Sequence, residues 1–220
     1  MAGFFDLDGP RFGPAAGGPP EQLVILLHGL GADGQDLIGI APHWAQVLPN
    51  AAFVSPNAPF PCDMAPYGYQ WFSVQDRSPE AMLSGVRMAA APLDAFIEKE
   101  MDAAGLDESR TALVGFSQGT MMSLFVGPRR ERPLAGIVGY SGRLIAPQLL
   151  AQEIRSRPPV LLAHGTADEV VPYASMAEAE KGLTAAGIQV ETLSSPGIGH
   201  GIDQEGLIRG AEFLHKVLNS

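Results

Sequence analysis

Short apolar runs recur along the chain, and each ends close to a glycine or a proline. They occupy residues 23–27, 52–54, 112–114, 137–138 and 160–163. Uninterrupted apolar runs of this length are typical of strands buried on both faces, as in a parallel sheet. A further run, 188–193, mixes apolar and polar positions in alternation and predicts a strand at the edge of that sheet.

Longer segments with helical spacing lie between these runs. Ser78-Pro79 predicts a helix start, with Ser78 as cap and Pro79 at the first helical position, and the apolar pattern continues toward Met101. Pro92 lies inside that pattern and predicts a kink or a break. Other helices are expected at residues 120–126, from Pro172 to about residue 187, and over 204–218.

Alternation of strands and helices predicts a mostly parallel sheet with helices on both faces. The pattern shows no repeat and no linker, so we expect an irregular arm over residues 1–20 and one domain over 21–220. Residues 57–78 form a long aromatic, proline-rich stretch between regular elements. Long loops of this kind in compact domains are usually functional, so this stretch is expected to form one wall of a site.

Composition narrows the classes of function. The chain has 220 residues, of which 46% are hydrophobic and 17% charged, which predicts a folded domain rather than a disordered chain. Its formal net charge is −10 and no basic cluster is present, so a nucleic-acid partner is not expected. We also expect no stable membrane insertion, because no apolar run approaches the roughly 18 residues that span a bilayer.

Cysteine content and the first residues bear on location. Cys62 is the single cysteine, so no internal disulfide can form, which fits a reducing compartment. Residues 1–20 are rich in glycine and proline and lack the apolar stretch of a signal peptide. A cytoplasmic protein is therefore expected.

The segment 115–119, Gly-Phe-Ser-Gln-Gly, matches the pattern G-x-S-x-G. It follows the apolar run 112–114 and precedes a helical pattern, the strand–turn–helix context in which such a serine is a nucleophile. The turn would expose the Ser117 hydroxyl at the carboxyl end of the strand. The same five residues can also occur by chance on a turn between a strand and a helix, so the assignment depends on partners for Ser117.

Two such partners occur in the expected chain order, serine, then acid, then histidine. Asp168 follows the run 160–163, and a carboxylate there can hold an imidazole in the required tautomer. His200 lies on a glycine-rich loop after the last strand and can act as a general base near neutral pH. Asp168 could instead cap the following helix, as Asp203 could.

Other candidate residues have simpler interpretations. His28 and His164 end strand-like runs and are expected to be buried and hydrogen-bonded, whereas His43 and His215 fall in helical patterns where surface positions are expected. Cys62 lies in the irregular loop without a tight turn to expose it. Ser141 follows another strand and is expected to line the site or to cap a helix.

The segment 28–34, His-Gly-Leu-Gly-Ala-Asp-Gly, follows the first strand-like run. Its glycines allow a backbone shape that aims an amide at the group attacked by Ser117, so the amides of Leu30 and Gln118 are predicted to form an oxyanion hole. A phosphate-binding loop is the alternative, but the segment lacks both G-x-G-x-x-G and the Lys-Ser/Thr of a P-loop.

Together, the segments 28–34, 115–119, 165–168 and 199–200 resemble those of the phospholipase/carboxylesterase family of α/β-hydrolases, over about residues 23–218. The resemblance implies a single-domain α/β-hydrolase without a separate lid domain, a Ser117–Asp168–His200 triad, and Leu30 and Gln118 as oxyanion donors. It also implies that Trp71 and Phe72 border the acyl pocket, to which Leu144 could add an apolar contact. Such proteins require neither metal nor organic cofactor, and they often form homodimers.

The family includes bacterial carboxylesterases and acyl-protein thioesterases. The thioesterases usually carry an acidic residue soon after the tryptophan, whereas Ser73 follows Trp71-Phe72 here, so the carboxylesterase branch is the closer fit. The resemblance therefore implies a serine esterase acting on small or lipid-like acyl esters of short to medium chain length. Thioester or lysophospholipid hydrolysis remains an alternative within enzymes, and a catalytically silent binding protein remains one outside them.

Overall fold

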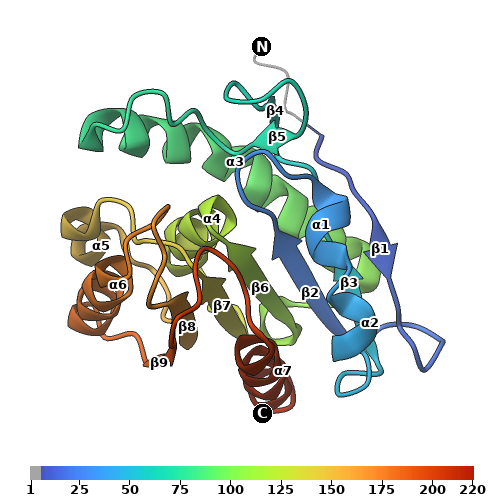
Figure 1. Ribbon diagram of the computed structural model, residues 1–220. Helices are drawn as coiled ribbons and strands as arrows, with labels where there is room; N and C mark the ends of the chain where they lie inside the picture. Colours follow the sequence, from blue (N-terminus) through green and yellow to red (C-terminus); the bar gives the residue numbers. More distant parts are fainter. Residues whose placement is uncertain (1–5) are drawn as a thin grey trace.

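The computed structural model describes residues 6–220 (Figure 1). Within that range, one large sheet has the strand order β1-β3-β2-β6-β7-β8-β9. Neighbouring strands run parallel except β1, which pairs antiparallel with β3. The strands of this sheet are β1 (Arg11–Phe12), β2 (Gln22–Leu27), β3 (Ala51–Val54), β6 (Thr111–Phe116), β7 (Gly136–Tyr140), β8 (Val160–Gly165) and β9 (Val190–Ser195).

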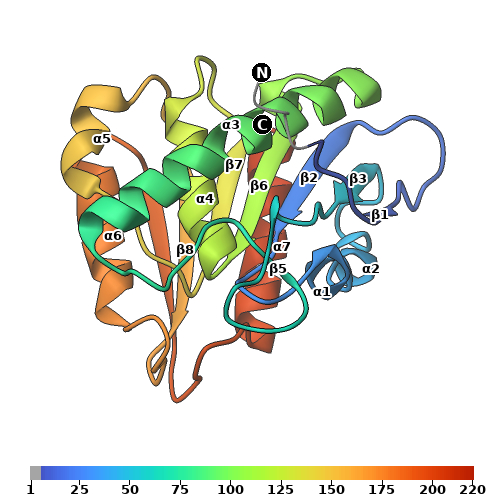
Figure 2. The same cartoon turned by 90° about the horizontal axis from the view of Figure 1, so that it is seen from above.

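Helices cover both faces of the sheet, as the alternating pattern predicts (Figures 1 and 2). Helices α3 to α6 pack on one face, where they share a core with Ile25, Leu113 and Ile137, whereas α1, α2 and α7 share the other with Val24 and Val114. The helices are α1 (Gly34–Ile38), α2 (Ala41–Trp44), α3 (Pro79–Ala104), α4 (Gln118–Val126), α5 (Pro147–Glu153), α6 (Ala174–Ala185) and α7 (Gln204–Leu218), with 3-10 turns η1 (Glu108–Arg110) and η2 (Gly127–Arg129).

The predicted strands are confirmed, with small differences at their ends. β2, β6, β7 and β8 are almost completely buried because each lies between two strands and under helices on both faces. β9 forms the end of the sheet and has the alternating burial expected of an edge strand. Since the central strands run parallel, the segments that follow β2, β6, β8 and β9 meet at one edge of the sheet.

Two expectations need correction. The arm predicted over residues 1–20 is not irregular throughout, because Arg11-Phe12 forms β1 and pairs with Phe53-Val54; residues 1–5 lie outside the described range. Of the kink or break predicted at Pro92, the break does not occur. α3 runs on from Pro79 to Ala104, because buried side chains on both sides of Pro92, such as Val86 and Phe96, hold its two halves against the same core.

Residues 57–78 lie over the carboxyl edge of the sheet. They contain a short hairpin of β4 (Phe60–Pro61) and β5 (Tyr69–Gln70), which is drawn above the end of β2 in Figure 1. Backbone hydrogen bonds from Gly31 N to Tyr69 O (2.9 Å) and from Tyr69 N to Ala32 O (2.8 Å) fasten this loop to the segment after β2. None of the helices within residues 6–220 combines the length and apolar character that crossing a bilayer requires.

Candidate active site

Ser117 lies at the turn between β6 and α4 in a backbone conformation that L-residues rarely adopt. Its φ is 54° and its ψ is −113°. Such a conformation costs about 1–3 kcal/mol and persists only where the surroundings impose it. Here the amide of Ser117 donates to Tyr140 O (2.8 Å), and Thr120 Oγ1 lies 2.8 Å from the carbonyl oxygens of both Gly115 and Tyr140. The strained turn predicted from G-x-S-x-G is therefore present.

The two glycines of the motif are required by close backbone approach. A Cβ placed on Gly119 would lie 1.8 Å from Leu27 O, and one on Gly115 would lie 2.3 Å from Thr120 N. Both distances are far below van der Waals contact. The glycines let the start of α4 pack directly against the end of β2, which brings Ser117 next to the segment that contains Leu30.

Asp168 and His200 form a direct hydrogen bond. His200 Nδ1 lies 2.8 Å from Asp168 Oδ2, while Asp168 Oδ1 accepts from the amides of Val170 and Val171, both at 2.9 Å. The carboxylate thus caps its own turn with one oxygen and faces the imidazole with the other. It does not cap the following helix α6, whose N-cap is Tyr173. Burial of the carboxyl opposes its ionisation, but these hydrogen bonds outweigh burial and hold the pKa of Asp168 below its usual value.

His164 supports the same carboxylate from the end of β8. Its Nε2 lies 2.9 Å from Val171 O and 3.2 Å from Asp168 Oδ2. The side chain is buried, as the sequence predicts. Because Val171 O can only accept, Nε2 carries a proton, and His164 joins both ends of the turn that holds Asp168. His164 lies in β8, two strands away from the β6 strand that precedes Ser117, and nothing in the sequence predicted its contact with Asp168.

His200 reaches the end of β6 as well. Its ring centroid lies 4.9 Å from that of Phe116, the residue before Ser117. The Ser117 hydroxyl and the imidazole make no hydrogen bond in the described chain, and such contacts often tighten only when substrate binds. The loops after β6, β8 and β9 thus bring the three predicted residues to one edge of the sheet.

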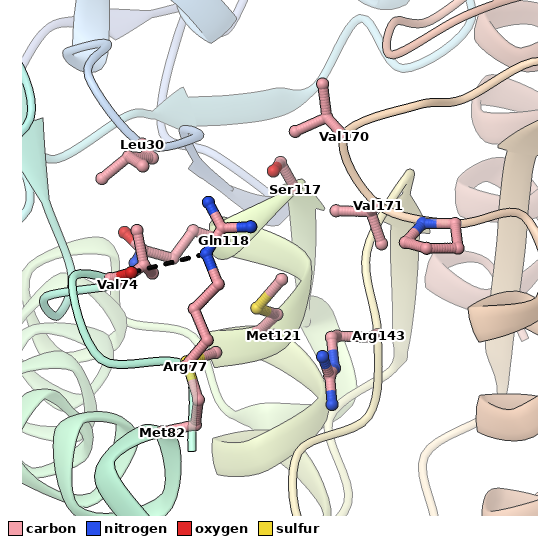
Figure 3. Close-up of a pocket in the computed structure, with 11 residues that line it drawn as sticks. Leu30, Val74, Arg77, Met82, Ser117, Gln118, Met121, Arg143, Val170 and Val171 are labelled. Carbon is pink, nitrogen blue, oxygen red and sulfur yellow. Dashed lines mark hydrogen bonds between the residues drawn. The ribbon is translucent and has the colours of Figure 1, made fainter. Parts of the chain in front are cut away.

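Leu30 and Gln118 lie where oxyanion donors are expected. Leu30 lines the pocket beside Ser117, and Gln118 is the first residue of α4, where a helix leaves amides without an intrahelical acceptor (Figure 3). His28 shapes the loop that carries Leu30. Its Nδ1 lies 2.7 Å from Gly29 O, and its Nε2 accepts from the amide of Ala58 at 3.0 Å, so the ring is neutral with its proton on Nδ1.

We expect His28 to make folding sensitive to mild acid. Burial lowers its pKa, opposed in part by its bond to Gly29. Because the unfolded chain binds this proton more readily, the free energy of unfolding should fall as pH drops below about 6.5. Urea unfolding at several pH values measures this slope. In His28→Gln the slope should shrink, whereas the exposed His43→Gln should keep it; equal slopes in wild type and His28→Gln would contradict the prediction.

The side chain of Gln118 binds the backbone of the 57–78 loop, a contact that the sequence did not reveal. Its Oε1 accepts from the amide of Trp71 (2.8 Å) and its Nε2 donates to Phe72 O (2.7 Å). The indole of Trp71 donates in turn to His28 O (3.0 Å). The loop at 57–78 is therefore tied to both predicted oxyanion segments.

Replacing Gln118 with alanine should leave two buried backbone groups unpaired. At about 1–3 kcal/mol for each such group, the free energy of unfolding should fall by about 2–6 kcal/mol. Chemical denaturation of Gln118→Ala and of the exposed control Gln152→Ala would measure the difference. A loss below about 1 kcal/mol would show that water replaces the lost contacts.

The pocket beside Ser117 is mostly apolar and small, with about 100 Å³ of internal space. Figure 3 shows Ser117 between Leu30 on one side and Val170 and Val171 on the other. Val74 and Arg77 contribute a wall from the 57–78 loop, as predicted. The lining residues are Leu30, Val74, Arg77, Met82, Ser117, Gln118, Met121, Arg143, Val170, Val171 and Pro172.

The predicted substrate contacts of Trp71, Phe72 and Leu144 are not found in this pocket. Trp71 and Phe72 are 0% and 2% exposed, because Gln118 and His28 draw the loop backbone and the indole inward. Leu144 is buried as well and packs in the core under α6. The pocket instead takes Val74 and Arg77 from the same loop and Arg143 from the segment before Leu144.

The remaining candidates lie outside the pocket lining. Cys62 is half-buried in the β4–β5 hairpin, and Ser141 is buried, with its hydroxyl 3.4 Å from Gly201 O. His43 and His215 are exposed on helices, as expected. Among residues 6–220, His, Cys, Asp and Glu side chains form no group of three or more arranged to hold a metal ion.

The parallel sheet, the strained serine turn and the edge where these loops meet define an α/β-hydrolase fold. A family model described as phospholipase/carboxylesterase matches residues 14–218. The chain belongs to this family, and it is a serine hydrolase of the carboxylesterase and acyl-protein thioesterase type.

Individual relatives agree with this assignment. Acyl-protein thioesterase 1 of Schizosaccharomyces pombe is 32% identical over 209 residues, covering 90% of this chain and 91% of the relative. Esterase YpfH of Escherichia coli is 30% identical over 202 residues, covering 91% and 84%. Among solved structures, esterase PE8 superposes with a TM-score of 0.92 at 43% identity, covering 97% of this chain and all of the other.

Proposed function

We propose that the protein is a carboxylesterase that hydrolyses esters of short to medium acyl chains through Ser117, His200 and Asp168. The observation that carries the proposal is the strained Ser117 turn, together with an imidazole that contacts the preceding Phe116 and is held by a buried carboxylate. The small apolar pocket supports short acyl groups, since each buried methylene contributes about 0.8 kcal/mol only where it finds room. The similarity to esterases supports the reaction class.

In the proposed reaction, His200 Nε2 accepts the proton of Ser117 as Oγ attacks the ester carbonyl. The amides of Leu30 and Gln118 bind the resulting oxyanion, a contact whose loss typically costs about 2.7–4 kcal/mol in the barrier. His200 then gives its proton to the departing alkoxide. Water, activated by the same imidazole, cleaves the acyl-enzyme and releases the acid. Asp168 stabilises the imidazolium of His200 during both acylation and deacylation.

Two measurements test the proposal. A fluorophosphonate probe should label the wild-type protein at Ser117 and fail to label Ser117→Ala; an unlabelled wild type would favour a binding protein on this fold. A panel of esters and thioesters with matched acyl chains then separates the proposed esterase from a thioesterase, the activity named for several relatives. Higher kcat/KM on thioesters than on the matched esters would overturn the carboxylesterase proposal. The expected homodimer stays a prediction.

A further inference from the structure

Two arginines at the pocket have no acidic partner. Most basic side chains in the described part of the chain form ion pairs; Arg129 with Glu153 and Arg130 with Asp94 are examples. Within residues 6–220, neither Arg77 nor Arg143 forms an ion pair, although acidic residues outnumber basic ones by 24 to 14. The two guanidinium groups that line the pocket are thus among the few cations left open to an external anion.

The arginines enter the pocket from different parts of the fold. Arg77 precedes α3, and its Nε lies 3.4 Å from Val74 O, a contact that leaves the outer guanidinium nitrogens free to donate. Arg143 follows β7. Figure 3 shows the Arg77 head on the Gln118 side of the pocket and Arg143 below Val171, with Met121 between them in this view. Both side chains are exposed at the mouth of the pocket, so a dissolved anion can reach their guanidinium groups.

Nearby carboxylates do not neutralise these two groups. Asp76, the neighbour of Arg77, accepts from the amide of Ser78 (2.8 Å) in the turn that begins α3. Glu169, beside the pocket residue Val170, is exposed and makes no ion pair in the described chain. With a net charge of −10, the protein as a whole repels anions, so an anionic substrate would need cations placed locally at the site.

We propose that Arg77 and Arg143 make this site selective for esters that carry a negatively charged carboxylate or phosphate group near the scissile bond. This inference rests on the proposed esterase function and specifies its substrate class. The planar guanidinium fork matches the oxygens of both groups, and the apolar lining accepts the acyl carbons between charge and carbonyl. A neutral ester of the same length uses the apolar lining alone.

Matched substrate pairs test the proposal. For a charge on the acyl side, p-nitrophenyl hexanoate is compared with mono-p-nitrophenyl adipate; for a charge on the alcohol side, butyrylglycerol is compared with butyrylglycerol phosphate. The readout is the ratio of kcat/KM for the anionic ester to that for its neutral partner. In Arg77→Gln and in Arg143→Gln, this ratio should fall by about tenfold, equivalent to about 1.4 kcal/mol. Added salt should lower the wild-type ratio as well.

Arg157→Gln is the matched control. Arg157 is exposed, forms no ion pair in the described chain and precedes β8, at the edge of the sheet opposite the site. Arg157→Gln changes the net charge by the same amount as the two pocket variants. Its ratio of kcat/KM values should nevertheless stay within about twofold of the wild-type ratio. A fall of the ratio in the pocket variants for either substrate pair supports the proposal. The pair that responds shows whether the charge lies on the acyl side or on the alcohol side of the ester.

The proposal is overturned if the ratio changes by less than about twofold for both substrate pairs in both pocket variants. It is also overturned if Arg157→Gln lowers the ratio as much as the pocket variants do. Fluorophosphonate labelling separates this failure from failure of the proposed function. If Ser117 is labelled and the ratios do not move, only the anion selectivity is wrong. If the wild type is not labelled, the esterase function is wrong.

Discussion

Ser117→Ala is expected to lower turnover by about 10⁴-fold or more. The substitution removes the attacking oxygen and little else. Alanine carries the same Cβ as serine, so the strained backbone at φ 54° is no less tolerable, and the amide bond to Tyr140 O is kept. The residual rate would come from the pocket and the oxyanion donors, which still bind and polarise the ester.

Initial rates on p-nitrophenyl butyrate at neutral pH measure this effect, with thermal unfolding to show that the variant stays folded. Ser109→Ala is a suitable control, because Ser109 is exposed in η1 at the opposite edge of the sheet. If the Ser117 variant keeps most of the wild-type activity, another group attacks the ester and the mechanism is wrong.

Asp168→Asn is expected to lower kcat by about 10⁴-fold while leaving the fold intact. The amides of Val170 and Val171 both donate to Oδ1, so the asparagine oxygen must occupy that position. Its NH₂ group then faces His200 Nδ1, which must become an acceptor and carry its proton on Nε2 instead. An imidazole in that tautomer cannot take the proton of Ser117.

The same orientation of the asparagine side chain also places two donors face to face. The proton on His164 Nε2, 3.2 Å from Asp168 Oδ2, would also face the new NH₂ group, so the variant should lose stability as well as activity. Burst kinetics with p-nitrophenyl butyrate would show slow acylation. Asp102→Asn, on the exposed surface of α3, should behave like wild type. A kcat for Asp168→Asn within about tenfold of wild type would show that His200 does not depend on this carboxylate.

Sequence patterns predicted the parts of the fold that burial dictates. The central strands are uninterrupted apolar runs because both of their faces are covered, and α7 shows a regular apolar stripe because one side alone packs on the sheet. Short elements escaped prediction. β1 has two residues in a glycine- and proline-rich segment, and α1 and α2 have five and four, too few to show a period.

The residues of the site also divide into those that the sequence predicted and those that it did not. Ser117, Asp168 and His200 follow strand ends in glycine-containing segments, and these local motifs together with their chain order suggested them. Trp71 and Phe72 were misplaced because their place came from the family resemblance, while the hydrogen bonds that bury them come from Gln118, which is distant in the sequence. Arg77 and Arg143 gave no signal, since exposed arginines carry no periodic pattern and only the assembled pocket brings them together.

The turn from Asp168 to Val171 has a consequence for redesign of this enzyme. Val170 and Val171 form part of the pocket wall, yet their main-chain amides, not their side chains, hold the acid. Directed evolution can therefore sample side chains at position 170, which is 60% exposed, without displacing Asp168. Inserting or deleting a residue there would shift both amides at once, so loop-length libraries are better aimed at the opposite wall, around Val74.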